Sequence, residues 1–158
     1  MNELPLLNFP SYEFKITRNN EGQLFILDPV RRAEVSLTPE EWVRQHVIQY
    51  FQSASISRSL IGVERSWKIN KQQRRTDIIV FNNELLPILL VECKSPFVKI
   101  TSKEIEQILK YNLHFNCNRL YVTNGIVHYY YFRDGETSHL LYRELIAEDM
   151  LKEWLNVK

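Results

Sequence analysis

The sequence predicts an α/β domain in which helices flank a central mixed β-sheet. Two segments carry the signals of a helix N-terminus, and each continues with apolar residues at helical spacing. Short apolar or alternating runs of strand length lie between and after these segments, bounded by polar turns. The expected order is therefore helix, three strands, helix, strand, strand, and the 158 residues are enough for one domain with its own core.

The first helix is expected over residues 39 to about 54. Thr38 suits the N-cap, Pro39 the first helical position and Glu41 the third, which completes a T-x-x-E capping box. A second capping box precedes the apolar stripe of a helix over residues 102 to 115. The two boxes mark where the helices begin, and the apolar spacing gives each helix one face for the core.

Five strands are expected in the core, three between the two helices and two after the second. Their segments are residues 60–69, 76–82 ("TDIIVFN"), 85–94 ("LLPILLVECK"), 119–124 ("RLYVTN") and 126–132 ("IVHYYYF"). The first three read as an antiparallel meander, and the third, which is apolar on both faces, is typical of a central strand. Because a helix connects the third strand to the fourth, these two should be parallel neighbours.

Outside this core, the sequence predicts two short strands near the N-terminus and a helix at the C-terminus. The strands are expected at residues 12–17 and 23–28, and the helix from Leu140 to Leu155. The chain is interpreted as one domain, with an N-terminal β extension, a core and a C-terminal helical segment at residues 1–37, 38–133 and 134–158.

Charge and composition limit the classes of protein. Lys plus Arg is 20 and Asp plus Glu is 19, so the net charge of +1 argues against a highly basic nucleic-acid coat protein. Two distant cysteines and four scattered histidines suggest neither a disulfide framework nor a zinc site. With no basic signal region and no apolar run long enough for a membrane span, a cytoplasmic protein without membrane contact is expected.

The segment "LLVECKSP" at residues 89–96 places charged residues at the end of a strand that reads as core. Side chains alternate along a strand, so Glu92 and Lys94 share one face and Cys93 points to the other. Asp77 precedes the apolar run of the neighbouring strand, where its carboxylate can lie near Glu92. Two carboxylates and a backbone carbonyl suit Mg²⁺, and a lysine beside them can assist attack of water on a phosphodiester.

The acid on one strand and the acid-x-lysine on the next resemble the PD-(D/E)xK nuclease core. The similarity is to the N-terminal nuclease domain of type I restriction enzyme R subunits, over residues 38 to 133. It rests on "RRTDIIVF", "LLVECKSP", "EIEQILKYN" and "LYVTNGIVHYYYF". The segment "DPVRRAEVSLTPEEWVRQHVIQY" is also similar to small stand-alone bacterial proteins with this domain alone. The resemblance implies a restriction-endonuclease-like core and a nuclease that cleaves DNA.

The resemblance also implies a role for each matching residue. Asp77, Glu92 and the backbone carbonyl of Cys93 would hold Mg²⁺, for which Mn²⁺ can substitute, and Lys94 would be the catalytic lysine. The family's usual proline before the first acid is replaced by Thr76, which matters little because the acid carries the chemistry. The alternative explanation for the two acids and the lysine is a structural salt bridge at the end of the sheet, which the preceding strand and the following helix and hairpin make less favoured.

Helical positions add further candidates. Gln107 and Tyr111 match the family's Q-x-x-x-Y element and, being four residues apart, share a helix face, although either can be an ordinary surface residue. Members often contribute an acid from the first helix, for which Glu41 is the candidate. The capping box accounts equally for Glu41, and Glu40 or Glu64 can serve instead.

A basic turn separates the first two core strands. Its cations, Lys68, Lys71, Arg74 and Arg75, can grip DNA phosphates or can simply form a solvated hairpin tip. The sequence has no G-x-x-x-x-G-K-[ST] phosphate loop, so any motor or specificity function is expected from a separate protein, or there is none. A homodimer would supply the two sites that double-strand cleavage needs. The alternative function is a DNA-binding or regulatory subunit with little cleavage of its own.

Overall fold

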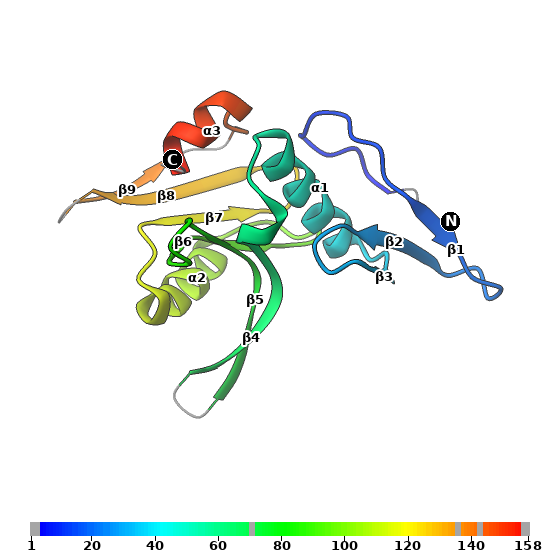
Figure 1. Ribbon diagram of the computed structural model, residues 1–158, viewed down its shortest axis with the longest axis horizontal. Coiled ribbons are helices and arrows are strands. Elements are labelled where there is room, and N and C mark those ends of the chain that lie inside the picture. Colours follow the sequence, from blue (N-terminus) through cyan, green and yellow to red (C-terminus); the bar gives the residue numbers. More distant parts are fainter. Residues whose placement is uncertain (1–3, 70–71, 135–136, 142–143, 156–158) are drawn as a thin grey trace.

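The computed structural model describes residues 4–69, 72–134, 137–141 and 144–155. They form a six-stranded sheet, a separate three-stranded sheet and helices packed around both (Figure 1). The small sheet comprises β1 (Ile16–Arg18), β2 (Leu24–Asp28) and β3 (Ala33–Ser36). The large sheet comprises β4 (Ile61–Ile69), β5 (Gln72–Phe81), β6 (Pro87–Cys93), β7 (Arg119–Thr123), β8 (His128–Asp134) and β9 (Thr137–Leu141). The helices are α1 (Pro39–Ser53), the short 3₁₀ turn η1 (Arg58–Leu60), α2 (Ser102–Phe115) and α3 (Glu148–Leu155).

The large sheet has the strand order β4-β5-β6-β7-β8-β9. Strands β4, β5 and β6 form an antiparallel meander, β6 and β7 are parallel, and β7, β8 and β9 are antiparallel again. Helix α2 makes the crossover between β6 and β7. This confirms the predicted mixed sheet, the meander and the parallel pair.

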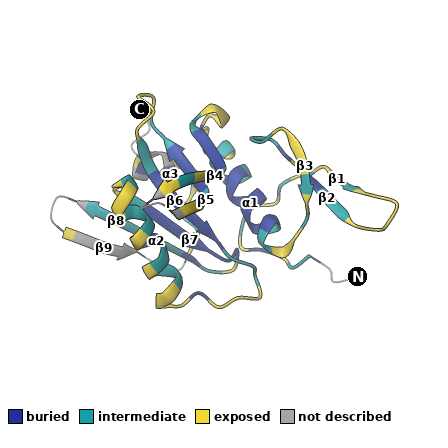
Figure 2. Ribbon diagram, turned by 90° about the horizontal axis from the view of Figure 1, so that it is seen from below, coloured by how far each residue is buried: buried dark blue, intermediate teal, exposed yellow. Residues whose placement is uncertain are grey.

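Helices cover both faces of the large sheet. Residues of α1 and α3 pack with one set of strand residues, which includes Ile78 and Val91, to form the larger core. Residues of α2 pack with the alternate set, which includes Ile79 and Leu90, to form the second core. Figure 2 shows the strands between these helices as the most buried part of the chain. The alternation of buried residues explains why β6 is apolar on both faces.

Both helices begin where the capping residues predict, but only one has a complete capping box. In α2, the Thr101 side chain and the Glu104 carboxylate cap each other's backbone N–H groups. In α1, Thr38 Oγ1 accepts from the backbone N–H of Glu41 at 3.0 Å. The reciprocal half is absent, because the N–H of Thr38 donates to the Ser36 carbonyl. The prediction that the Glu41 side chain completes a capping box is therefore wrong.

The predictions at the two ends of the chain need correction. Leu140 and Leu141 are not helical, because they belong to β9, which pairs with β8 as an antiparallel edge strand. The C-terminal helix begins only at Glu148. Strand β3 was not predicted, because its four residues are too few to show a strand pattern. It is stabilised by antiparallel pairing with β2. Both misses depend on pairing with another strand, which overrides local periodicity.

The small sheet lies beside α1 (Figure 1). Its central strand, β2, buries Ile26 and Asp28 completely. Gln45 of α1 donates from Nε2 to Asp28 Oδ2 at 2.8 Å, which links the sheet to the helix through a buried hydrogen bond. The N-terminal segment is thus connected to the same helix that borders the candidate site.

Candidate active site

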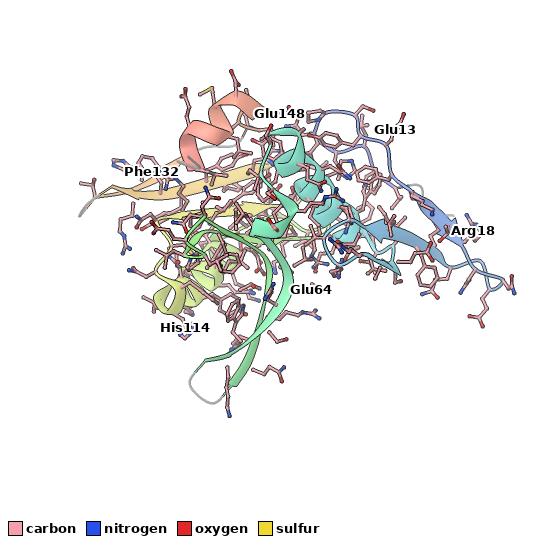
Figure 3. The ribbon with its side chains drawn as sticks, in the orientation of Figure 1. Glu13, Arg18, Glu64, His114, Phe132 and Glu148 are labelled. Atoms are coloured by element: carbon pink, nitrogen blue, oxygen red, sulfur yellow. The ribbon has the colours of Figure 1, made fainter. Side chains whose placement is uncertain are left out.

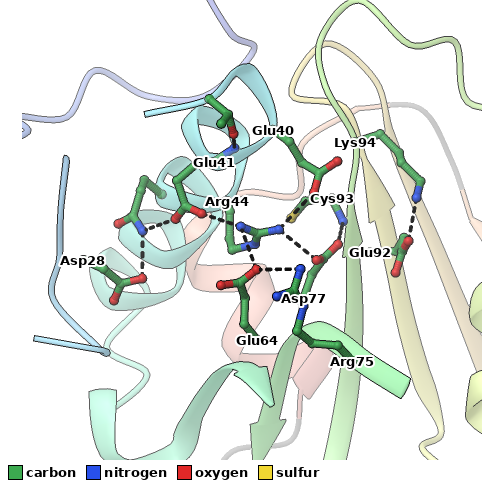
Figure 4. A network of polar contacts seen from close by, with 12 residues as sticks. Asp28, Glu40, Glu41, Arg44, Glu64, Arg75, Asp77, Glu92, Cys93 and Lys94 are labelled. Atoms are coloured by element: carbon green, nitrogen blue, oxygen red, sulfur yellow. Dashed lines mark hydrogen bonds and ion pairs between the residues drawn. The ribbon is translucent and has the colours of Figure 1, made fainter. Parts of the chain in front are cut away.

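Asp77 and Glu92 lie where β5 and β6 leave their hydrogen-bonded ladder. Ile78 is opposite Val91 in the antiparallel register. Asp77, just before Ile78, and Glu92, just after Val91, therefore lie at the same end of the two strands. The backbone N–H of Cys93 donates to Asp77 Oδ2 at 2.7 Å (Figure 4). This bond fixes the aspartate against the end of β6, as the meander predicted.

Lys94 and Gln107 both contact Glu92. Lys94 Nζ donates to Glu92 Oε1 at 2.6 Å, and Gln107 Nε2 donates to the same oxygen at 2.9 Å. The hydroxyl of Tyr111 lies 3.5 Å from Gln107 Nε2. The backbone N–H of Lys94 also donates to the Thr123 carbonyl at 2.8 Å, which anchors the chain just after β6. The structure therefore brings together the residues of the acid-x-lysine and Q-x-x-x-Y elements.

Burial and the repulsion between neighbouring acids raise the pKa of carboxyl groups in this site. The pKa of Glu92 is raised to about 7, mainly by burial and next by the charge of Asp77, while the hydrogen bond from Lys94 lowers it. Burial and the charge of Asp77 likewise raise the pKa of Glu40. Burial would lower the pKa of Lys94, but its hydrogen bond to Glu92 and the charges of the acids raise it. Because burial and the charge of Asp77 disfavour the ionised form of Glu92, a further cation beside the two acids would stabilise that form.

The donor set fits Mg²⁺. Among the described residues, no three His, Cys, Asp or Glu side chains are grouped so that they could hold a metal ion. The predicted set is smaller, with two carboxylates and the Cys93 backbone carbonyl, and Mg²⁺ commonly binds through one or two carboxylates while keeping several waters. The charge of Asp77 contributes to the raised pKa of Glu92, and a divalent ion bound between the two acids would offset this repulsion.

Arg44 of α1 is the main residue of the site that sequence reasoning missed. Its Nη2 donates to Asp77 Oδ1 at 2.9 Å and lies 3.1 Å from Glu40 Oε1. Its Nη1 pairs with Glu41 and lies 3.7 Å from Glu64 Oε1. The only local signal was its spacing of three and four residues from two acids on one helix.

The network continues from Arg44 into the small sheet. Arg31, just after β2, pairs with Asp28 at 2.7 Å, with Glu64 at 2.5 Å and with Glu41. Gln45 Nε2 also donates to Glu41 Oε1 at 2.8 Å. The acids on this side of the site are thus held by two arginines and an amide from separate parts of the chain.

The three acids considered as additional ligands occupy different surroundings. Glu41 is turned toward Arg31 and Arg44. Glu64 lies on β4 at the base of the β4–β5 hairpin (Figure 3), with φ of 48° in the left-handed region, an unusual conformation for a residue with a side chain. Glu40 shares Arg44 with Asp77, and the charge of Asp77 contributes to its raised pKa. Of the three, Glu40 shows the most direct electrostatic coupling to Asp77.

Most of the predicted basic turn is strand instead, because Gln73, Arg74 and Arg75 pair with β4 in the β4–β5 hairpin. This hairpin extends away from the helices (Figure 1). Lys68, Arg74 and Arg75 are exposed on it. Arg75 lies at its base, where Nη2 pairs with Glu64 at 3.2 Å. Lys71 lies outside the described residues. The hairpin therefore presents cations to solvent, and through Arg75 it contacts the acids of the site.

The fold and these contacts place the chain in the restriction-endonuclease-like class, with helices flanking a mixed sheet. The family model of the type I restriction enzyme R protein N terminus matches residues 39–145. The chain belongs to this family.

A solved structure agrees with this assignment at the level of the fold. It is a fragment described as an HsdR subunit of a type I restriction enzyme from Vibrio vulnificus, with a TM-score of 0.54 and 19% sequence identity. The match covers 75% of this chain and 25% of that chain, so the chain corresponds to about a quarter of the fragment. A search of curated proteins gave no match. No helix in the described part of the chain is long and apolar enough to cross a membrane.

Proposed function

We propose that this chain is a Mg²⁺-dependent nuclease of the PD-(D/E)xK class that hydrolyses phosphodiester bonds in DNA. The observation that carries the proposal is the convergence of Asp77, Glu92 and Lys94, at the ends of two adjacent strands, with Gln107 of α2. A structural salt bridge accounts for one lysine and one acid. It does not require Asp77, which has its own partner in Arg44, to lie close enough to raise the pKa of Glu92.

Each residue has a distinct role in the proposed reaction. When bound, the cation would supply an activated water and offset charge on the phosphate. Asp77 and Glu92, with the Cys93 carbonyl, would hold it, and the Cys93 N–H keeps Asp77 oriented. The Lys94 ammonium, positioned by Glu92, would donate a hydrogen bond to the attacking water or to a phosphate oxygen as charge develops there.

Gln107 is expected to orient Glu92 in this scheme. Its Nε2 fixes the Glu92 oxygen that Lys94 also uses. Gln107→Ala should lower kcat by at least about 10-fold, since a hydrogen bond to a charged group contributes roughly 1.5–3 kcal/mol, with little change in the melting temperature. The matched control is Glu106→Ala, an exposed position on the same helix. A loss of stability that parallels the loss of turnover would instead assign Gln107 a structural role.

DNA as the substrate is supported by the family and by the exposed cations of the β4–β5 hairpin, which can neutralise phosphates. Four further points stay predictions. They are a separate motor or specificity protein, a homodimer, the cytoplasmic location and the division of the chain at residues 37 and 133. The alternative function is a DNA-binding or regulatory subunit with little cleavage of its own. The near-neutral net charge of +1 argues against strong independent DNA binding and fits reliance on a partner.

The function is tested by incubating the purified chain with supercoiled plasmid and with single-stranded DNA. We expect nicked, linear or shortened products in Mg²⁺ or Mn²⁺ and none in EDTA. A mobility shift measured in the same samples separates the two functions. Binding without any cleavage in either metal would favour the regulatory subunit, and cleavage that persists in EDTA would rule out metal dependence.

A further inference from the structure

Arg44 is surrounded by the acids on the α1 side of the candidate site (Figure 4). Its side chain is only 4% exposed and approaches four carboxylates, those of Glu40, Glu41, Glu64 and Asp77. Two of these acids, Glu41 and Glu64, are also bound by Arg31. On this side of the site, the counter-charge is therefore supplied by arginine.

On the other side of Asp77, around Glu92, the neighbouring side chains are different. Glu92 faces Lys94 and Gln107 there, and within the described part of the chain its side-chain hydrogen bonds go to these two residues. Asp77 lies between the two regions, with Oδ1 on Arg44 and Oδ2 on the Cys93 N–H. Each carboxylate oxygen has two lone pairs, so both oxygens of Asp77 can still accept a further ligand.

A second divalent cation would need carboxylates beyond the pair formed by Asp77 and Glu92. The acids close to Asp77 on the α1 side are those that Arg44 already binds. An ion placed among them would have to displace a buried guanidinium and leave it without its partners, which is strongly unfavourable. Burial would lower the pKa of Arg44, but the charge of Asp77 and the other acids raises it, so the guanidinium keeps its charge.

We propose that the Arg44 guanidinium takes the place of a second metal ion, so that the site operates with one divalent cation, bound between Asp77 and Glu92. Arg44 is then a positioning residue that holds Asp77 and neutralises the acids of the α1 side. This inference rests on the proposed nuclease function, and it specifies the metal content of that same site.

The test is the number of Mn²⁺ ions bound per chain, measured by equilibrium dialysis and by electron paramagnetic resonance of free Mn²⁺. The wild type should bind one ion. Arg44→Gln removes the charge and should admit a second ion among the acids, and the double variant Arg44→Gln/Glu41→Gln should return to one. Arg58→Gln, at an exposed position in η1, is the matched control and should bind one ion.

The outcomes separate this inference from the proposed function. Two ions in the wild type, or one ion in a folded Arg44→Gln variant, would overturn the role of Arg44 and leave the metal-dependent nuclease standing. No ion in the wild type would overturn both proposals. If Arg44→Gln does not fold, the wild-type count still decides between one ion and two, and Arg44→Lys, which keeps a cation, is expected to bind one.

Discussion

Asp77→Asn should abolish the thermal stabilisation that Mn²⁺ gives to the wild type. At a concentration 100 times its dissociation constant, a bound ion stabilises a protein by about 2.7 kcal/mol. For a chain of this size that corresponds to a melting temperature higher by about 5–10 °C. The asparagine keeps the shape of the side chain and can still accept from Arg44 or from the Cys93 N–H, but it lacks the charge that a metal ion needs.

The matched control for this change is Glu84→Gln, which removes the charge of an exposed acid in the turn between β5 and β6. Differential scanning fluorimetry with and without Mn²⁺ should show the full shift in the wild type and in Glu84→Gln. An unchanged shift in Asp77→Asn would remove Asp77 from the ligand set. A shift lost equally in both variants would point to non-specific binding of the ion by surface acids.

Lys94→Ala is expected to lower the rate of DNA cleavage by at least about 100-fold, the lower range for a positioned proton donor or acceptor. The fold should remain, because the Lys94 side chain is 21% exposed and its backbone N–H, rather than its side chain, bonds to Thr123. The Mn²⁺-induced shift should persist or grow, since the ammonium no longer competes for Glu92 Oε1. Single-turnover cleavage beside the melting shift measures both effects.

Lys110→Ala, at an exposed position of α2, serves as the comparison for the loss of a lysine side chain. It should cleave at the wild-type rate. If Lys94→Ala retains full activity, Lys94 has no part in the mechanism. If it loses the Mn²⁺ shift together with activity, Lys94 acts by maintaining the metal site, and its role would be structural.

Local patterns predicted the parts of the fold that local interactions determine. The caps at Thr38 and Thr101 marked the first turns of α1 and α2, because an N-cap bond joins residues two or three positions apart. Strand alternation predicted that Glu92 and Lys94 lie side by side, and they form a hydrogen bond. The helix between β6 and β7 predicted their parallel pairing, because a crossover of this length requires it.

The missed features depend on contacts between distant segments. Glu41 suits a capping box by its position, but its carboxylate binds Arg31 and Arg44 instead. Arg31 reaches the site from the turn after β2, and nothing in its local sequence indicates that contact. In both cases, a partner in another element of the fold decides the outcome.

The most direct test of the account is the anomalous scattering of Mn²⁺ in crystals of the wild-type protein. The account predicts one strong peak between the carboxylates of Asp77 and Glu92, next to the Cys93 carbonyl, with Arg44 still bound to Asp77. A map without a peak at that position, or with its strongest peak among the acids around Arg44, would contradict the proposed metal site.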